Sequence, residues 1–298
     1  MTWHPRLPPR WQKGTLNSEW PILKRMNSSR SGQRPPQCVG LALGGGAVRG
    51  AAHVGVLQVL EREGIVPSII VGTSVGAIVG ACSAAGVSSA KMSHLFRSVR
   101  WFDLARLAWR KALGLFDLEP LEALVQDNIS VRTFNELPRR FAAVACDITT
   151  GQRVVLQTGA IARAVRASAA IPGLFTPAEI DGRLLVDGGV VDNLPVDVAR
   201  EMGADYVIAV DLFPPPSGRQ RPENLFELLL VAGGLWSRSN HPHPSTIDCY
   251  ILPDIGDYRV WDFDAVPALE ACGRAAAERI LPKLKADLGL ESMSALVI

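Results

Sequence analysis

A serine stands between two glycines in Gly72-Thr73-Ser74-Val75-Gly76, directly after a buried-looking apolar run. This is the form of a nucleophile elbow, in which a strand turns sharply into a helix and exposes a serine hydroxyl. The glycines remove side chains that would clash in such a turn. A serine hydroxyl is a poor nucleophile at neutral pH, so it needs a partner that takes its proton. The alternative is a serine that only caps a helix, and the pattern alone is weak in a chain with 27 glycines.

A second glycine-rich stretch, Gly44-Gly45-Gly46, follows another apolar run and opens a helical pattern. Backbone N–H groups at a helix N-terminus can face a phosphate or the oxyanion of an acyl intermediate. A dinucleotide site would need G-x-G-x-x-G and an acidic residue after the second strand, and the sequence has neither. The glycines and the nearby serine together favour an oxyanion hole. A nucleotide-binding enzyme is therefore only the third hypothesis for this chain.

None of the five histidines has the surroundings of a catalytic base. His53 falls inside a predicted helix and is expected to be structural, and His94 also lies in a helical pattern. His241 and His243 follow the serine in the chain order of an ordinary hydrolase, but they alternate with prolines in a predicted loop. His4 belongs to the N-terminal tail. We therefore predict that the proton acceptor is not a histidine.

Asp187 is the candidate that replaces it. It ends a short apolar strand and is followed by Gly188 and Gly189, which would let it reach a neighbouring loop. A carboxylate with an ordinary pKa near 3.9 is a weak base, but burial in an apolar cleft would raise that pKa. The alternative is a simple Asp-Gly-Gly turn. The competing acids are Asp181, Asp192 and Asp211.

The elements that must position these residues follow an alternating pattern. We expect strands at 39–43 and 68–71, each followed by a helix, at 47–63 and 74–85, which predicts a parallel sheet with right-handed crossovers. Further along we expect a mostly helical region at 88–137 containing Trp101, Phe102 and Trp109, a hairpin at 140–145 and 153–157, and a helix at 160–167. The remaining expectations are a turn at 180–183, strands at 184–186, 206–212 and 247–252, and helices at 196–202, 223–235 and 265–287, the last interrupted at Pro282.

Charge divides the chain into a tail and a folded part. The net charge is +2, but residues 1–36 carry seven Lys or Arg against one acid and are rich in proline. We expect 1–36 to be a poorly ordered basic tail, with contact to an anionic membrane surface as the sharper interpretation. Residues 37–298 then form one domain. The uncharged stretch 69–87 could suggest a membrane span, but its glycines and Val/Ile start favour a strand, a turn and a helix.

Taken together, the three motifs resemble the patatin-like phospholipase family from Val39 to Asp211, including the stretch Arg166 to Pro172. The resemblance implies an α/β fold, a central mostly parallel sheet flanked by helices in three layers. It implies a Ser–Asp dyad, with Ser74 as nucleophile and Asp187 as base. The oxyanion hole would be formed by Gly44, Gly45, Gly46 and Ala47. Supporting residues are Arg49, Gly72, Gly76, Gly188 and Gly189, and Ala47 stands where many members have a fourth glycine.

The resemblance implies a hydrolase that cleaves lipid carboxylic esters, of the phospholipase A or lysophospholipase type, through an acyl-enzyme. A lipid-binding or regulatory protein with little turnover is the alternative. We expect no cofactor, no metal and no nucleic acid; zinc spacing is absent among the five cysteines. The expected location is cytoplasmic, with peripheral contact at the inner face of the membrane through the tail. Residues 214–245 carry no motif.

Overall fold

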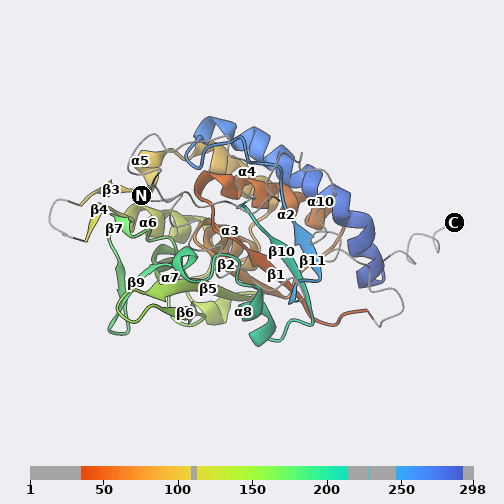
Figure 1. The fold of residues 1–298 in the computed structure, drawn as a ribbon, viewed down its shortest axis with the longest axis horizontal. Coiled ribbons are helices and arrows are strands. Elements are labelled where there is room, and N and C mark those ends of the chain that lie inside the picture. The colour runs from red at the N-terminus through yellow and green to blue at the C-terminus, as the bar shows by residue number, and fades with distance from the viewer. Residues whose placement is uncertain (1–34, 109–112, 214–227, 229–245, 291–298) are drawn as a thin grey trace, which may run out of the picture.

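The computed structural model describes residues 35–108, 113–213, 228 and 246–290. Eight strands of the described residues form one sheet at the centre of the molecule (Figure 1). Its first five members run in the order β11-β10-β1-β2-β5, and all four neighbouring pairs among them are parallel. Their bounds are β1 Val39–Leu43, β2 Ile69–Thr73, β5 Arg140–Asp147, β10 Tyr206–Val210 and β11 Cys249–Ile251.

Beyond β5 the sheet becomes antiparallel. β6 (Gln152–Leu156) and β9 (Arg183–Asp187) both pair with β5, and β8 (Ala178–Ile180) pairs with β9. Val144 pairs with β6 and with β2, whereas Ala145 pairs with β6 and with β9. Because a strand has only two sides, β2 and β9 must share one side of β5. They run toward each other along it and meet end to end.

Helices cover both faces of the sheet, so the predicted three-layer α/β fold is confirmed (Figure 1). Strand residues alternate between the two faces: Leu41 and Leu43 pack in one core and Ala42 in the other. The first face carries α2 (Ala51–Arg62), α3 (Val75–Ala84), α4 (Ser89–Ser98), α6 (Glu119–Asn128), α7 (Ile161–Ser168) and α10 (Val266–Leu288); the second carries α8 (Val196–Glu201).

The expectation of a mostly helical region at 88–137 is wrong in part. It contains α4, α5 (Trp101–Leu104), α6 and the short 3₁₀ turn Phe134–Glu136, but also two strands of a second, small sheet. β3 (Arg106–Leu107) pairs with β4 (Gly114–Asp117), which pairs with β7 (Gly173–Phe175). The local sequence cannot reveal β4, because its parallel partner lies about sixty residues later. Trp109 lies outside the described residues.

A second expectation is also wrong: α10 continues through Pro282 without interruption. The helix is held along α2, so the packing outweighs the lost hydrogen bond of one proline. The stretch 69–87 folds into β2 and α3 as predicted, not into a membrane span. Nearly all of the predicted tail and of the region 214–245, including the helix predicted at 223–235, lie outside the described residues.

Candidate active site

Ser74 occupies the sharp turn between β2 and α3 with φ +56°, a region that side-chain-bearing residues rarely adopt. The turn is possible because both flanking glycines touch backbone. A Cβ atom on Gly76 would lie 2.1 Å from the carbonyl oxygen of Leu43, and one on Gly72 would lie 2.2 Å from that of Gly76. The Gly-x-Ser-x-Gly pattern therefore reflects a close approach of the elbow to β1, as a nucleophile elbow requires.

The hydroxyl of Ser168, the last residue of α7, links the turn at Ser74 to β5. The backbone N–H of Ser74 donates to the Ser168 hydroxyl oxygen at 2.9 Å, and that hydroxyl donates to the carbonyl of Val144 at 2.6 Å. Ser168 is fully buried. Sequence reasoning placed Ser168 inside a family motif but gave it no task. The sequence feature that could have identified Ser168 is a serine among alanines in Arg166 to Ala170, where an apolar residue would be enough for packing alone.

Asp187 stands at the end of β9, level with Ala145 of β5, while Thr73 is level with the preceding residue, Val144. The two strand ends are therefore about one residue step, roughly 3.3 Å, apart along β5. The Asp187 carboxylate accepts a hydrogen bond of 2.7 Å from the Gly189 N–H, and the Ser74 side chain is close enough to lower the pKa of the carboxyl. The structure thus brings together the serine and the aspartate singled out in the sequence.

Burial sets the basicity of Asp187. Only 6% of the residue is exposed, and this desolvation raises the pKa of its carboxyl from 3.8 to about 6. The Ser74 side chain and the Gly189 N–H act in the opposite direction, because both stabilise the carboxylate. Gly188 is required here for space, since a Cβ atom on it would lie 2.3 Å from the Val144 carbonyl oxygen. The carboxylate is ionised at neutral pH and more basic than an ordinary aspartate.

The glycine loop passes beside Ser74, but its four predicted members differ in what their N–H groups do. Gly44 donates to the carbonyl of Val210 at 3.0 Å, and Gly45 donates to that of Asn193 at 3.2 Å. No hydrogen bond joins the N–H of Gly46 or of Ala47 to any described residue. All four residues are expected to supply oxyanion-hole donors, but only the N–H groups of Gly46 and Ala47 are available for this role. The N–H groups of Gly44 and Gly45 hold the loop in place instead.

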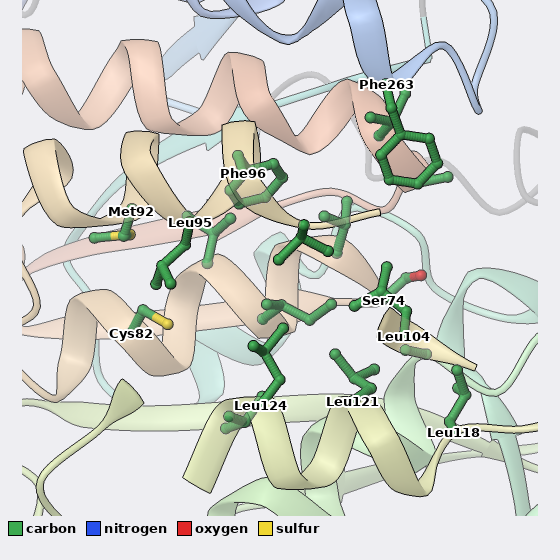
Figure 2. Close-up of a pocket in the computed structure, with 18 of the residues that line it drawn as sticks. Ser74, Cys82, Met92, Leu95, Phe96, Leu104, Leu118, Leu121, Leu124 and Phe263 are labelled. Carbon is green, nitrogen blue, oxygen red and sulfur yellow. The ribbon is translucent and has the colours of Figure 1, made fainter. Parts of the chain in front are cut away.

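An apolar pocket of about 150 Å³ leads away from Ser74 (Figure 2). It runs between α3, α4 and α6, and Ser74 and Ala47 lie on its wall. Figure 2 shows Ser74 at one end and Cys82 and Met92 at the other, with Leu121 and Leu124 of α6 between them. Val260, Trp261 and Phe263 close the wall near Ser74. The pocket suits a hydrocarbon chain attached to a group that reacts at Ser74.

A family model described as patatin-like phospholipase matches residues 41–200, which is more than half of the chain. The chain belongs to the patatin-like phospholipase family. An uncharacterized NTE family protein of Mycobacterium tuberculosis is 40% identical over 58% of this chain and 49% of the relative. A second such protein of that organism is 32% identical over 94% of this chain and 51% of the relative. The chain thus spans about half the length of these relatives.

The fold of this patatin-like chain also resembles a solved structure. VipD from Legionella pneumophila aligns with a TM-score of 0.57 at 16% sequence identity, covering 83% of this chain and 67% of VipD. At that identity the similarity concerns the fold alone. It supports the layered α/β architecture, including part of the chain outside residues 41–200.

Two residues of the glycine loop adapt the patatin-like site to this chain. Ala47 has φ +49°, the left-handed conformation in which glycine is favoured. Arg49 is 9% exposed and donates two hydrogen bonds, from Nε at 3.1 Å and from Nη2 at 2.6 Å, to the carbonyl of Tyr258. Burial lowers the pKa of Arg49 to about 10, so it stays charged at neutral pH. Arg49 therefore joins the loop to the segment that closes the pocket.

The described histidines have places other than beside Ser74 and Asp187. His53 is fully buried in α2, and its Nε2 donates to the carbonyl of Gly44 at 2.8 Å, so it supports the glycine loop. Burial lowers its pKa to about 4, which keeps the ring neutral. His94 is exposed on α4. His4, His241 and His243 lie outside the described residues.

The three other candidates for the acidic partner of Ser74 either lie in a turn or bind other side chains. Asp181 is in the turn between β8 and β9 with φ +49°, and Asp192 pairs with Arg153 at 3.0 Å. Asp211 accepts a hydrogen bond of 2.7 Å from the Tyr250 hydroxyl. Among the described residues, no group of three or more His, Cys, Asp or Glu could hold a metal ion. Within the same part of the chain, no helix has both the length and the apolar character needed to cross a membrane.

Proposed function

We propose that this protein is a serine hydrolase that cleaves the acyl esters of lipids, of the phospholipase A or lysophospholipase type. The observation that carries the proposal is the Ser74 side chain beside the buried Asp187 carboxylate, with Ser74 on the wall of an apolar pocket. Membership of the patatin-like phospholipase family supports it. The expected membrane contact through the basic tail stays a prediction.

In this mechanism Asp187 takes the proton of Ser74 as the serine oxygen attacks the ester carbonyl. The negative charge that develops on the carbonyl oxygen is stabilised by the N–H groups of Gly46 and Ala47. The carbon–oxygen bond to the alcohol then breaks, and the alcohol leaves with the proton held by Asp187. Water attacks the acyl-enzyme, Asp187 takes a proton from it, and the fatty acid leaves as Ser74 regains its proton.

The raised pKa of Asp187 fits this role, because a base works best when its pKa approaches the working pH. Burial also means that water does not solvate the carboxylate, so little water competes with the Ser74 hydroxyl for it. A histidine is not needed to hold the proton, since Asp187 contacts the serine itself.

A fluorophosphonate probe and a panel of lipid esters test the proposal. Wild-type protein should be labelled at Ser74 and should release fatty acid, whereas Ser74→Ala should do neither. Asp187→Asn should lose at least about a thousandfold in kcat, because an amide cannot accept the proton of Ser74. The matched control is Asp181→Asn in the β8–β9 turn, where asparagine tolerates the left-handed backbone, and it should retain activity.

Two outcomes would contradict the proposal. Folded Asp187→Asn protein with substantial ester turnover would exclude the dyad. Wild-type protein that binds lipid but is neither labelled nor active would favour the alternative, a lipid-binding protein that retains the fold with negligible turnover. The circular dichroism spectrum and melting temperature of each variant show whether a loss of activity is a loss of folding.

A further inference from the structure

Three helices turn the same kind of apolar stripe toward the pocket. α3 contributes Val75, Ile78, Val79 and Cys82, α4 contributes Met92, Leu95, Phe96 and Val99, and α6 contributes Leu121, Leu124, Val125 and Asn128. Each set has the spacing i, i+3, i+4, i+7 of one helix face. Stripes of this kind normally close against one another to form a core, but here they leave a cavity that reaches Ser74.

The end of the pocket away from Ser74 is lined by buried side chains. Cys82 and Met92 are 6% and 2% exposed, and Figure 2 shows both at the end of the pocket away from Ser74. The ammonium group of Lys91, the neighbour of Met92 in the chain, donates to the carbonyl of Asn128 at 3.1 Å and so joins α4 to α6. The Asn128 side chain donates to the Leu124 carbonyl at 2.9 Å, which satisfies the one amide at this end.

We infer that this pocket selects acyl chains by length, with Cys82 and Met92 as the stop for the methyl end and the Lys91–Asn128 hydrogen bond as a link that holds the two helices together beside them. The inference rests on the proposed acyl hydrolase function and deepens it. It assigns to this protein a preference for medium-length acyl chains, because a longer chain would have to bend back or displace the stop.

The length of α3 sets the scale. Cys82 lies eight residues after Ser74, which corresponds to about 12 Å at a rise of 1.5 Å per residue. An extended hydrocarbon advances about 2.5 Å for every two carbon–carbon bonds of about 1.5 Å. The pocket therefore accommodates roughly nine or ten carbons, so octanoyl and decanoyl groups should fit and a palmitoyl group should not.

The chemistry of Cys82 is consistent with a methyl stop. Burial raises the pKa of its thiol to about 11, so the thiol is protonated and behaves as a small apolar group. Met92 is flexible and apolar, which suits the end of a pocket that must contact a terminal methyl group. Neither residue contacts the dyad, so both can be changed without altering Ser74 or Asp187.

The experiment measures kcat/KM for p-nitrophenyl butyrate, octanoate, decanoate, laurate and palmitate. Wild-type protein should prefer octanoate or decanoate, with palmitate at least about tenfold lower. Cys82→Leu fills the end and should move the optimum to a shorter chain. Met92→Ala and Lys91→Ala enlarge or open the end and should raise laurate relative to octanoate by roughly tenfold. His94→Ala, exposed on the same helix, is the matched control and should leave the profile unchanged.

Two outcomes would overturn the inference but not the proposed hydrolase function. One is a wild-type optimum at palmitate. The other is that variants with wild-type melting temperatures show the same dependence of kcat/KM on chain length as wild type. Absence of turnover and of Ser74 labelling would instead overturn the proposed function. In that case the pocket is tested by fatty-acid binding to Ser74→Ala protein. Decanoate should raise its melting temperature more than palmitate does, and Cys82→Leu in that background should reverse the order between decanoate and octanoate.

Discussion

At the scale of single residues, the raised pKa of Asp187 predicts how activity depends on pH. Proton acceptance requires the carboxylate, so kcat/KM should rise with pH through an apparent pKa near 6 and then level off. A histidine base would give a similar midpoint, but the profile would then survive in Asp187→Asn, which it should not. The measurement is kcat/KM from pH 4 to pH 8 in wild type.

The same shift has a consequence for stability. A carboxyl whose pKa is raised from 3.8 to about 6 stabilises the fold below about pH 4, and this contribution is lost as pH rises through 6. At pH 8 the buried charge costs up to about 3 kcal/mol. Asp187→Asn should therefore be more stable than wild type at pH 8 and not at pH 4. Urea unfolding at both values checks this, and equal differences would contradict it.

Ser168 offers a second prediction at this scale. Ser168→Ala leaves the Ser74 N–H and the Val144 carbonyl without their shared partner, at a cost of about 1–3 kcal/mol in unfolding free energy. Since the hydroxyl holds the elbow and not the substrate, kcat should fall more than KM changes. The rate of fluorophosphonate labelling should fall with kcat. An unchanged labelling rate in a destabilised variant would leave Ser168 a purely structural residue.

The sequence predicts the nucleophile and its acid partner because each lies in a short motif with its own glycines. It cannot predict that Gly44 and Gly45 are engaged, since the accepting carbonyls belong to Val210 and Asn193, far along the chain. Ser168 is hidden for the same reason: its two partners come from other elements. Local sequence patterns indicate which residues could have a functional role. They do not show which backbone groups form hydrogen bonds with a distant segment.

At the scale of elements, the same limit separates the predicted strands from the missed ones. β1, β2 and β10 are continuous apolar runs, as strands buried on both faces should be, and their positions are confirmed. β3 and β4 are short and partly exposed; β4 forms because β7 lies beside it, and β3 pairs with β4 in turn. Their formation is a tertiary effect that no window of local sequence contains.

Pro282 gives a prediction for one element. It lies exposed inside α10, where proline lacks the N–H that would bond to Glu278. Pro282→Ala should restore that hydrogen bond and raise the unfolding free energy by about 1–3 kcal/mol, the upper value being the helix propensity difference. Thermal or urea unfolding measures the gain. The control is Pro267→Ala in the first turn of α10, where the missing N–H costs little, and a larger gain there would contradict the argument.

At the scale of the whole molecule, the site extends past the segment that matches the family model. Residues 41–200 supply Ser74, Asp187 and the glycine loop, whereas Val260, Trp261 and Phe263 contribute to the wall of the pocket that Ser74 lines. Arg49 is the link between the two parts, because its guanidinium holds the carbonyl of Tyr258. The Val48 N–H adds a hydrogen bond of 2.9 Å to the carbonyl of Val260. The C-terminal part is thus a component of the site.

Arg49→Lys tests this link. A lysine cannot supply the paired donors of a guanidinium, so the segment 258–263 should loosen while the dyad stays in place. Hydrogen–deuterium exchange of that segment should rise, and kcat/KM for octanoyl and decanoyl esters should fall about tenfold. Arg62→Lys, in an exposed ion pair on α2, is the control and should change neither quantity. Faster exchange without any change in kcat/KM would separate the segment from substrate binding.

The end-to-end meeting of β2 and β9 along β5 also bears on how the chain folds. The Ser74–Asp187 contact forms only when β9 pairs with β5 in the native register. A slip of one residue would turn the carboxylate to the opposite face of the sheet and leave the serine without its partner. Reactivity at Ser74 therefore reports the alignment of these strands. Its recovery during refolding shows when β2 and β9, more than a hundred residues apart in the chain, both lie in native register along β5.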